Sequence, residues 1–140
     1  MAKNFAQCKG QRAERQVIQL LQPVVNEVYE AAGKEPPELM RNLMQSNKGG
    51  FDIAGLEWLA LEVKHQETLH LNAWWLQCVE QGNGKREPIL FYKQNNVKWQ
   101  IMMFGRLVPG GSTNVRAPCI ISIESFMLYF KYRLEHEVMK

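Results

Sequence analysis

The chain has 140 residues, of which 46% are hydrophobic and 22% are charged, and its formal net charge is +3. This composition is typical of one globular domain over residues 1–140 with a sizeable core, and it argues against a disordered chain. No apolar run reaches the ~18 residues of a membrane-spanning helix, and the polar N-terminus does not resemble a signal peptide. The three cysteines form no CxxC pair, which excludes a disulfide scaffold or a zinc ribbon and favours a cytoplasmic protein.

A long first helix is predicted over residues 9–32. Apolar residues recur there at helical spacing, at Ala13, Val17, Leu20, Leu21, Val24 and Val28. Pro23 lies inside this stretch and is expected to kink or split the helix, because proline lacks the amide donor. Gly33 is expected to end it. The next stretch, residues 34–44, begins with prolines and predicts a short helix.

Two adjacent strands are predicted next, at residues 51–54 and 56–64. A turn at Gly55 would join them as a hairpin. A second helix is predicted over residues 72–81, with Asn72 as its N-terminal cap and a glycine pair after its end.

Three further strands are predicted at residues 88–93, 97–104 and 119–123, the last after a Gly/Ser loop over residues 108–113. A closing helix follows over residues 125–139. Its expected buried side carries Phe126, Tyr129, Phe130 and Leu134. This element order predicts an α/β fold with a mixed central sheet flanked by helices.

A glutamate and a lysine are expected to project together from the predicted strand at residues 56–64. Glu62 is followed two residues later by Lys64, a spacing found nowhere else in the sequence. Because side chains alternate along a strand, the two share one face, together with Ala60 and Trp58. The apolar residues between them point the other way, into the core. Charges on a buried strand are costly unless they are paired or bound to a metal.

Asp52, the only aspartate in the chain, is placed on the neighbouring strand of the hairpin. Two carboxylates that converge beside a lysine suit a hard, oxygen-liganded cation such as Mg²⁺. Such a cation can activate water and hold a phosphoryl oxygen, and Lys64 would stabilise the developing charge. The alternative is a simple ion pair between Glu62 and Lys64 on an exposed edge strand.

Two further features favour the metal interpretation. Gly49-Gly50 precede Asp52 and allow the backbone to approach a ligand closely. Glu14 lies at the edge of the apolar face of the first helix, where its carboxylate can point toward the sheet. The alternative for Glu14 is a solvated helix charge paired with Arg15 or another neighbour.

These residues occur in an order that resembles the PD-(D/E)XK nuclease superfamily. The matching segments are Lys9-Gly10-x-x-Ala13-Glu14-Arg15, Gly50-Phe51-Asp52-Ile53 and Leu61-Glu62-Val63-Lys64. The resemblance is greatest to the Holliday-junction-resolvase-like endonucleases of phage and archaea. The stretch from Leu71 to Asn95 resembles the phage-encoded members in particular. One departure is Phe51, which stands where the superfamily name has proline.

The resemblance implies a restriction-endonuclease-like core and a divalent-metal site. Glu14, Asp52 and Glu62 would bind Mg²⁺, or Mn²⁺ as a substitute. Together with Lys64 they would be the catalytic residues. A serine upstream of the aspartate assists in some resolvases, and Ser46 is the candidate in this chain.

Basic and acidic residues are segregated along the chain. Residues 1–16 carry four basic residues against Glu14 alone, and residues 85–116 carry six against Glu87 alone. The acids gather instead at Glu27, Glu30, Glu35 and Glu38. This pattern favours a phosphate-binding face, the alternative being lysines that merely keep the protein soluble. The candidate nucleic-acid contacts are Lys9, Arg12, Arg15, Lys48, Gln66, Lys85 and Arg86.

The aromatic residues are interpreted as structural residues before a functional role is considered. Trp74-Trp75 favour core packing or a dimer contact over stacking on a base. The closing helix carries more apolar surface than packing on one face of a small sheet requires. The additional apolar side chains are expected to lie in the core or in a dimer contact. The histidines have no metal-ligand spacing with cysteine.

The function that the sequence favours is a Mg²⁺-dependent DNA endonuclease of the resolvase type, with no membrane partner. It would act as a homodimer on branched DNA such as four-way junctions, in the host bacterial cytoplasm if it is phage-encoded. Two sites related by a twofold axis would cut two strands symmetrically. The alternatives are a nuclease of the same fold that nicks or trims other DNA, and a DNA-binding protein without cleavage activity. The complete set of Asp52, Glu62 and Lys64 argues against the last, because converging carboxylates repel phosphate.

Overall fold

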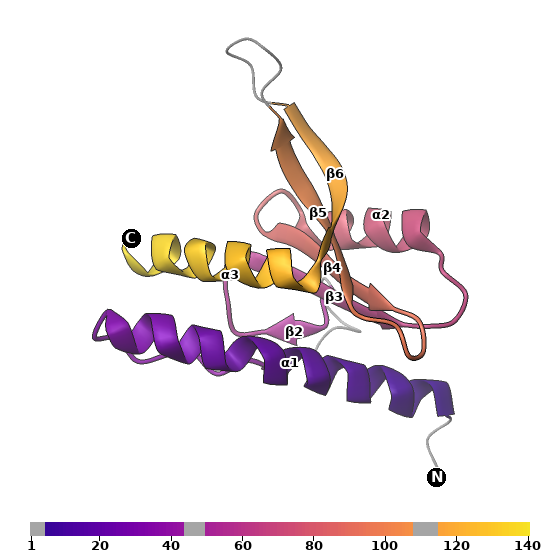
Figure 1. Ribbon diagram of the computed structural model, residues 1–140, viewed down its shortest axis with the longest axis horizontal. Coiled ribbons are helices and arrows are strands. Elements are labelled where there is room, and N and C mark those ends of the chain that lie inside the picture. The colour runs from indigo at the N-terminus through magenta and orange to yellow at the C-terminus, as the bar shows by residue number, and fades with distance from the viewer. Residues whose placement is uncertain (1–4, 44–49, 108–114) are drawn as a thin grey trace.

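The computed structural model describes residues 5–43, 50–107 and 115–140. In chain order its elements are α1 (Phe5–Ala31), β1 (Met40–Arg41), β2 (Ile53–Ala54), β3 (Leu59–His65), α2 (Leu71–Gly82), β4 (Glu87–Lys93), β5 (Gln100–Leu107), β6 (Val115–Ser122) and α3 (Ile123–Val138). The strands lie in sequence order in one sheet, and all neighbours are antiparallel except the parallel pair β3 and β4. The predicted mixed sheet flanked by helices is confirmed (Figure 1).

Two separate apolar clusters bury the central part of the sheet on both faces, whereas β6 is largely exposed. In the first cluster, α1 and α3 pack on one face of the sheet. The ring of Phe126 stacks on that of Phe130, one turn further along α3, and contacts the ring of Phe91 of β4 edge-on. In the second, α2 covers the other face, and its Trp74 and Trp75 are only 6% and 7% exposed. The interpretation of the tryptophans as core residues is confirmed, and stacking on a base is excluded because both indoles are buried.

Helix α1 remains one helix through Pro23 (Figure 1), so the chain is not split there. Leu21 and Val25, on either side of Pro23, are fully buried in the same cluster, and this packing keeps the two halves together. Pro23 itself lies on the exposed side. Among the described residues, none of the helices combines the length and the apolar character that crossing a bilayer would require.

The prediction of a short helix at residues 34–44 is wrong over residues 34–43, the part that the structure describes. Residues 34–39 are irregular, and Met40–Arg41 form β1, which pairs with β2. Gln22 of α1 holds this segment through two hydrogen bonds: its Nε2 donates to the Pro37 carbonyl at 3.0 Å, and its Oε1 accepts from the Leu39 N–H at 2.7 Å. The tertiary contact replaces the helix that local spacing indicated.

The cap predicted at Asn72 is also wrong. Helix α2 begins at Leu71, and His70 at the N-cap position makes no capping hydrogen bond through its side chain. Leu71 packs against the second apolar cluster, which draws the helix start one residue earlier. The predicted end is confirmed, because Asn83 takes the left-handed conformation that closes a helix.

Strand β6 and helix α3 are longer than predicted. β6 pairs with β5 residue by residue from Val115 to Ser122, so its length follows from its partner and not from its own apolar run. Helix α3 then begins at Ile123, where the Ser122 hydroxyl accepts a hydrogen bond from the Ser125 N–H at 3.1 Å. The predicted loop at residues 108–113 lies outside the described residues.

The turn before β3 requires glycine at position 55. Gly55 has a φ of +131°, and a Cβ atom there would lie 2.8 Å from the Glu38 carbonyl oxygen. We expect Gly55→Ala to lower the free energy of unfolding by about 1–3 kcal/mol, since backbone strain and a close contact coincide. Gly10→Ala, where nothing lies within 4 Å, is the matched control and should raise stability by about 0.5–1 kcal/mol. Urea unfolding measures both, and a Gly55→Ala protein as stable as the wild type would contradict this turn geometry.

Candidate active site

Three carboxylates are buried where α1 meets β2 and β3. Glu14 is 8% exposed, Asp52 is 8% exposed and Glu62 is 2% exposed. They are the only buried polar or charged side chains among the residues whose side chains are described. Burying like charges together is unfavourable, so a site of this kind needs a compensating cation or bound protons.

Backbone hydrogen bonds hold Asp52 against the strands on both sides. Its N–H donates to the Leu61 carbonyl at 2.8 Å, and its carbonyl accepts from the Asn42 N–H at 2.8 Å. Its carboxylate Oδ2 accepts from the Val63 N–H at 2.8 Å. The hairpin of β2 and β3 therefore fixes both the main chain and the side chain of Asp52, as the predicted strand pairing required.

Asp52 and Glu62 together form a pair of buried carboxyl groups, the acid pair. Burial raises the pKa of both carboxyl groups, to about 6 for Asp52 and to about 9 for Glu62. The charge on Asp52 raises the pKa of Glu62 further, and a hydrogen bond between the two side chains raises the pKa of Glu62 and lowers that of Asp52. The Oε1 atom of Glu62 is buried and has no hydrogen-bond partner in the described residues.

Lys64 follows Glu62 on β3 and is half-buried. Its positive charge lowers the pKa of Asp52 and of Glu62, which places the ammonium group within electrostatic range of both carboxylates. The expectation that Trp58 shares this face is wrong. Trp58 precedes β3, so strand alternation does not reach it, and its ring packs 6.2 Å from that of Phe130 in the first cluster.

Glu14 reaches the site from α1 but is held by a partner. The Nε of Arg41, on β1, donates to Glu14 Oε1 at 2.7 Å. The charge of Glu14 still raises the pKa of Asp52 and of Glu62, so it lies within electrostatic range of the pair. Nevertheless, no group of three or more Asp, Glu, His or Cys side chains in the described ranges is arranged to hold a metal ion. Arg41 was not among the sequence candidates, because it was expected on a helix and not on a strand beside Asp52.

The chemistry of the acid pair fits a hard divalent cation. Glu62 presents an unpartnered buried oxygen, and Asp52 contributes a carboxylate that its backbone bond already orients. Carboxylate oxygens are the ligands that Mg²⁺ and Mn²⁺ prefer. A cation would also stabilise the charged form of Glu62, whose pKa is raised first by burial and then by the charge of Asp52.

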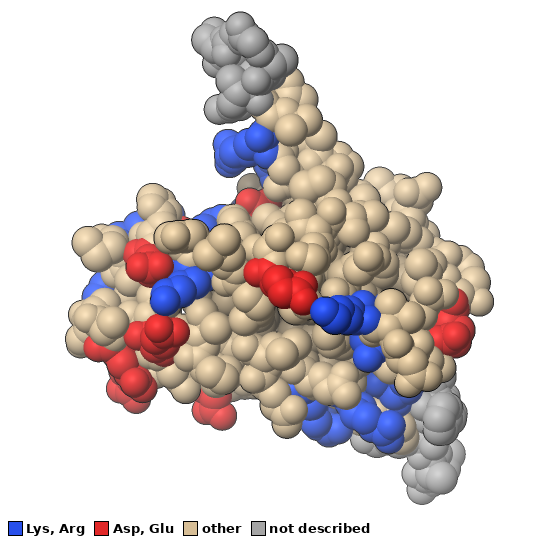
Figure 2. Space-filling model, viewed as in Figure 1, with Lys and Arg blue, Asp and Glu red and all other residues tan. Residues whose placement is uncertain are grey.

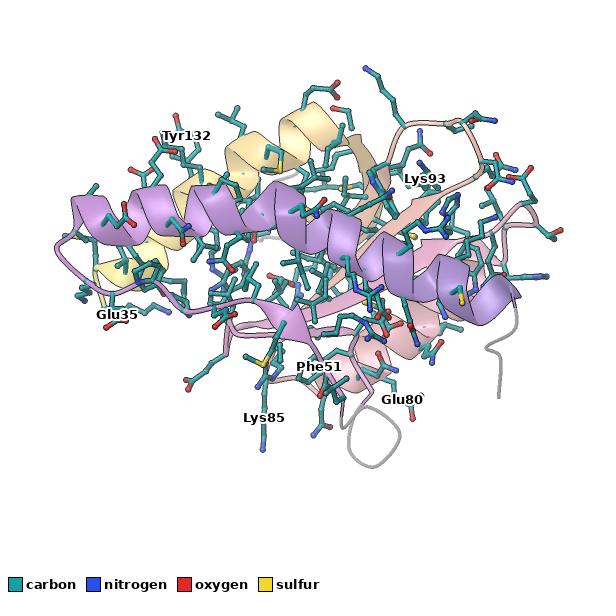
Figure 3. All side chains as sticks on the ribbon, turned by 90° about the horizontal axis from the view of Figure 1, so that it is seen from below. Glu35, Phe51, Glu80, Lys85, Lys93 and Tyr132 are labelled. Atoms are coloured by element: carbon teal, nitrogen blue, oxygen red, sulfur yellow. The ribbon has the colours of Figure 1, made fainter. Side chains whose placement is uncertain are left out.

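The predicted nucleic-acid contacts divide into two groups. Arg12 and Arg15 are exposed and Lys9 is half-buried on the first turns of α1, where Figure 2 shows basic groups gathered while acidic groups crowd the other end of the helix. Lys85 is exposed in the loop after α2 and projects beside Phe51, on the other side of α1 from Lys93 in Figure 3.

The remaining predicted contacts differ in their surroundings. Arg86 is used within the fold, because its guanidinium donates to the carbonyls of Leu56 and Leu59 at 3.1 and 3.2 Å and covers the Phe51 ring. Gln66 is exposed just after β3. Lys48 and Ser46 lie outside the described residues.

Two residues near Lys64, His65 and Lys93, were not among the predicted site residues. His65 lies next along β3, and Lys9 and Lys93 both lower its pKa, after burial as the main cause. Lys93 pairs with His65 in the parallel register of β3 and β4. The parallel pairing of β3 with β4 places Lys93 at the same end of the sheet as Lys64, a proximity that the spacing of these residues in the sequence does not indicate.

A mixed sheet that carries two carboxylates and a lysine, covered by a helix with a third carboxylate, is the core arrangement of a PD-(D/E)XK nuclease. The sequence matches the family described as "Phage putative PDDEXK endonuclease" over residues 6–116, and the chain belongs to this family. No curated protein matches the sequence. A similar solved structure is that of Hjc, a Holliday junction resolvase from the archaeal hyperthermophile Archaeoglobus fulgidus. It is 21% identical, with 86% of this chain and 88% of that chain covered and a TM-score of 0.44.

The acid pair predicts how stability depends on pH in the absence of metal. The folded protein holds protons on Asp52 and Glu62 above the pH at which exposed carboxyl groups lose them, because both pKa values are raised. Stability should therefore fall as the pH rises from about 5 toward 9, by at most about 1.4 kcal/mol per pH unit for one proton. Thermal unfolding in a chelator measures this slope.

Glu62→Gln isolates the contribution of the pair from that of other titrating groups. The amide cannot ionise, so the difference in stability between the variant and the wild type should grow with pH. A difference that stays constant between pH 5.5 and 8.5 would contradict the raised pKa of Glu62.

Proposed function

We propose that this nuclease is a divalent-metal-dependent DNA endonuclease whose catalytic residues are Glu14, Asp52, Glu62 and Lys64. The observation that carries the proposal is the buried pair of Asp52 and Glu62, with an unpartnered oxygen on Glu62 and with Lys64 beside it. A bound Mg²⁺ or Mn²⁺ supplies Lewis-acid activation of water and of a phosphoryl oxygen.

The residues of this chain have distinct tasks in that reaction. Asp52 and Glu62 hold the cation, and the Val63 N–H fixes the orientation of the Asp52 carboxylate. Glu14 is proposed as the third ligand. The ammonium group of Lys64 donates hydrogen bonds and stabilises the negative charge that grows on the phosphate in the transition state.

We further propose that the substrate is branched DNA and that the protein acts as a single-domain homodimer on four-way junctions. Two features support this. The basic residues at the start of α1 lie on the same helix as Glu14, so phosphate contacts and the site are held by one element. Leu128 and Tyr132 of α3 are 61% and 65% exposed, an apolar surplus that a second copy would cover.

A cleavage panel tests the proposal. Four-way, forked, duplex and single-stranded DNA of matched sequence are incubated with Mg²⁺, Mn²⁺, Ca²⁺ or a chelator. We expect cleavage of the four-way junction with Mg²⁺ and Mn²⁺, and none with Ca²⁺, which accepts looser geometry. Undiminished cleavage in the chelator would contradict a metal mechanism. Cleavage of no substrate would favour a DNA-binding protein without activity.

Binding experiments separate the resolvase from the broader nuclease. Sedimentation should show a dimer, and competition at fixed salt should favour the junction over linear duplex. The affinity should fall with salt at a log–log slope of about −0.9 per phosphate neutralised. A monomer that binds both forms equally would leave the nuclease chemistry in place and end the resolvase assignment.

A further inference from the structure

Arg41 forms the most buried ion pair of the described residues. Its side chain is 20% exposed and that of Glu14 is 10% exposed, with 2.7 Å between Nε and Oε1. Arg41 lies opposite Ile53 in the pairing of β1 with β2. The next residue, Asn42, therefore lies opposite Asp52. Arg41 is thus held by the sheet, next to Asn42, whose N–H donates to the Asp52 carbonyl.

The charge balance of the site explains why a guanidinium is present. Three carboxylates are buried together, Lys64 acts on Asp52 and Glu62, and Arg41 pairs with Glu14. Arginine keeps its charge at any pH that a protein tolerates, so it compensates Glu14 permanently. A divalent cation at Asp52 and Glu62 would bring a second, stronger positive charge to the same place.

We propose that Arg41 is an internal counter-ion that competes with the divalent cation for Glu14. Asp52 and Glu62 would hold the cation, and Glu14 would be free to act as a third ligand only when its ion pair with Arg41 is broken. This rests on the proposed metal-dependent function and adds a residue that limits metal affinity. It accounts for a site in which three acids are close enough to interact although the described residues contain no ready three-ligand group.

A purely orienting role for Arg41 predicts the opposite result, which makes the proposal testable. If Arg41 only held Glu14 in position for the metal, its removal would weaken metal binding. If Arg41 competes, its removal frees Glu14 and also removes a repelling charge, so metal binding becomes tighter. The same removal leaves the metal-free protein with uncompensated buried carboxylates and lowers its melting temperature.

The experiment is a calorimetric titration of Mn²⁺ into the wild type, Arg41→Gln and Arg41→Lys without DNA. Arg41→Gln should bind Mn²⁺ about tenfold more tightly than the wild type, and Arg41→Lys, which keeps the charge, within about threefold of it. Lys131→Gln is the matched control. Lys131, on α3, pairs at 3.3 Å with Glu27 of α1. Glu27 lies about 20 Å from Glu14 along the axis of α1. The Lys131→Gln substitution also removes one positive charge, and it should leave the affinity for Mn²⁺ unchanged.

A double-mutant cycle separates competition for Glu14 from general repulsion. In a Glu14→Gln background the ion pair is absent, so adding Arg41→Gln should tighten Mn²⁺ binding much less than it does alone. An equal gain in both backgrounds would overturn the proposal. Because Arg41→Gln is less stable without metal, the rise in melting temperature on adding Mn²⁺ gives a second measurement, and it should exceed the rise in the wild type.

Three other results would also overturn the proposal. Arg41→Gln could bind Mn²⁺ more weakly, in which case Arg41 orients Glu14, or with the wild-type affinity, in which case Arg41 does not influence metal binding. Arg41→Lys could tighten binding as much as Arg41→Gln, in which case charge is not the cause. A wild type that binds no Mn²⁺ would remove the proposed metal-dependent function itself, and this outcome is distinguished by the wild-type titration alone.

Discussion

Glu62→Gln is expected to lower the rate of phosphodiester cleavage by at least about 10³-fold, because it removes a charged oxygen ligand from the metal. The same change should leave DNA binding intact, because the raised pKa already keeps Glu62 uncharged at neutral pH in the absence of metal. The side chain is only 2% exposed, and the amide has nearly the same shape, so the fold should persist. Without metal the variant should be more stable than the wild type at pH 8. At this pH an exposed carboxyl group is ionised, whereas burial keeps Glu62 protonated in the folded protein, which lowers the free energy of unfolding of the wild type.

Single-turnover cleavage and equilibrium DNA binding are the measurements for this variant. Asp52→Asn should behave in the same way, although its carboxylate also accepts the Val63 N–H, so part of its effect is on the hairpin. Glu57→Gln is the control, because Glu57 is exposed in the loop between β2 and β3 and is not part of the site. Cleavage by the Glu62→Gln and Asp52→Asn enzymes at the normal rate would refute the site as proposed.

The second large effect is expected at Lys64. Lys64→Gln should reduce the cleavage rate by about 10²–10³-fold at saturating metal, which is the typical loss when one stabilising donor to a developing charge is removed. Unlike Glu62→Gln, it should not weaken Mn²⁺ binding, since it removes a positive charge near the ligands. The two variants therefore separate the chemical step from metal binding.

Rate and affinity must both be measured for Lys64→Gln to make that separation. Lys131→Gln serves again as the exposed control and should cut at the wild-type rate. If Lys64→Gln lost its Mn²⁺ affinity together with its activity, the lysine would be a structural partner of the acid pair. If it cut normally, Lys64 would have no part in the reaction.

Sequence spacing alone was sufficient to place most of the elements and the acid pair. Apolar residues at helical spacing predicted α1, and the alternation around Glu62 predicted a strand beside that of Asp52. These features are local, because a strand or helix pattern depends on neighbours a few residues apart. The two carboxylates needed only one hairpin to meet, so their proximity could also be inferred.

Features that depend on distant contacts could not be inferred. The side chain of Gln22 holds residues 37–39 in an irregular form, and β6 is lengthened by its pairing with β5. No local pattern contains these contacts, since their partners are far away in the chain. For the same reason the strand at Met40–Arg41 was mistaken for part of a helix.

The chemistry-bearing residue types were thus determined by the sequence, whereas their electrostatic state was decided by the tertiary structure. Glu62 in a Glu-x-Lys spacing is visible in any reading of the chain, but its raised pKa arises from burial beside Asp52. Glu14 was correctly identified as a carboxylate at the rim of an apolar helix face. Its partner Arg41 became known only when β1 was folded against β2, because an ion pair across 27 residues is set by packing and not by spacing.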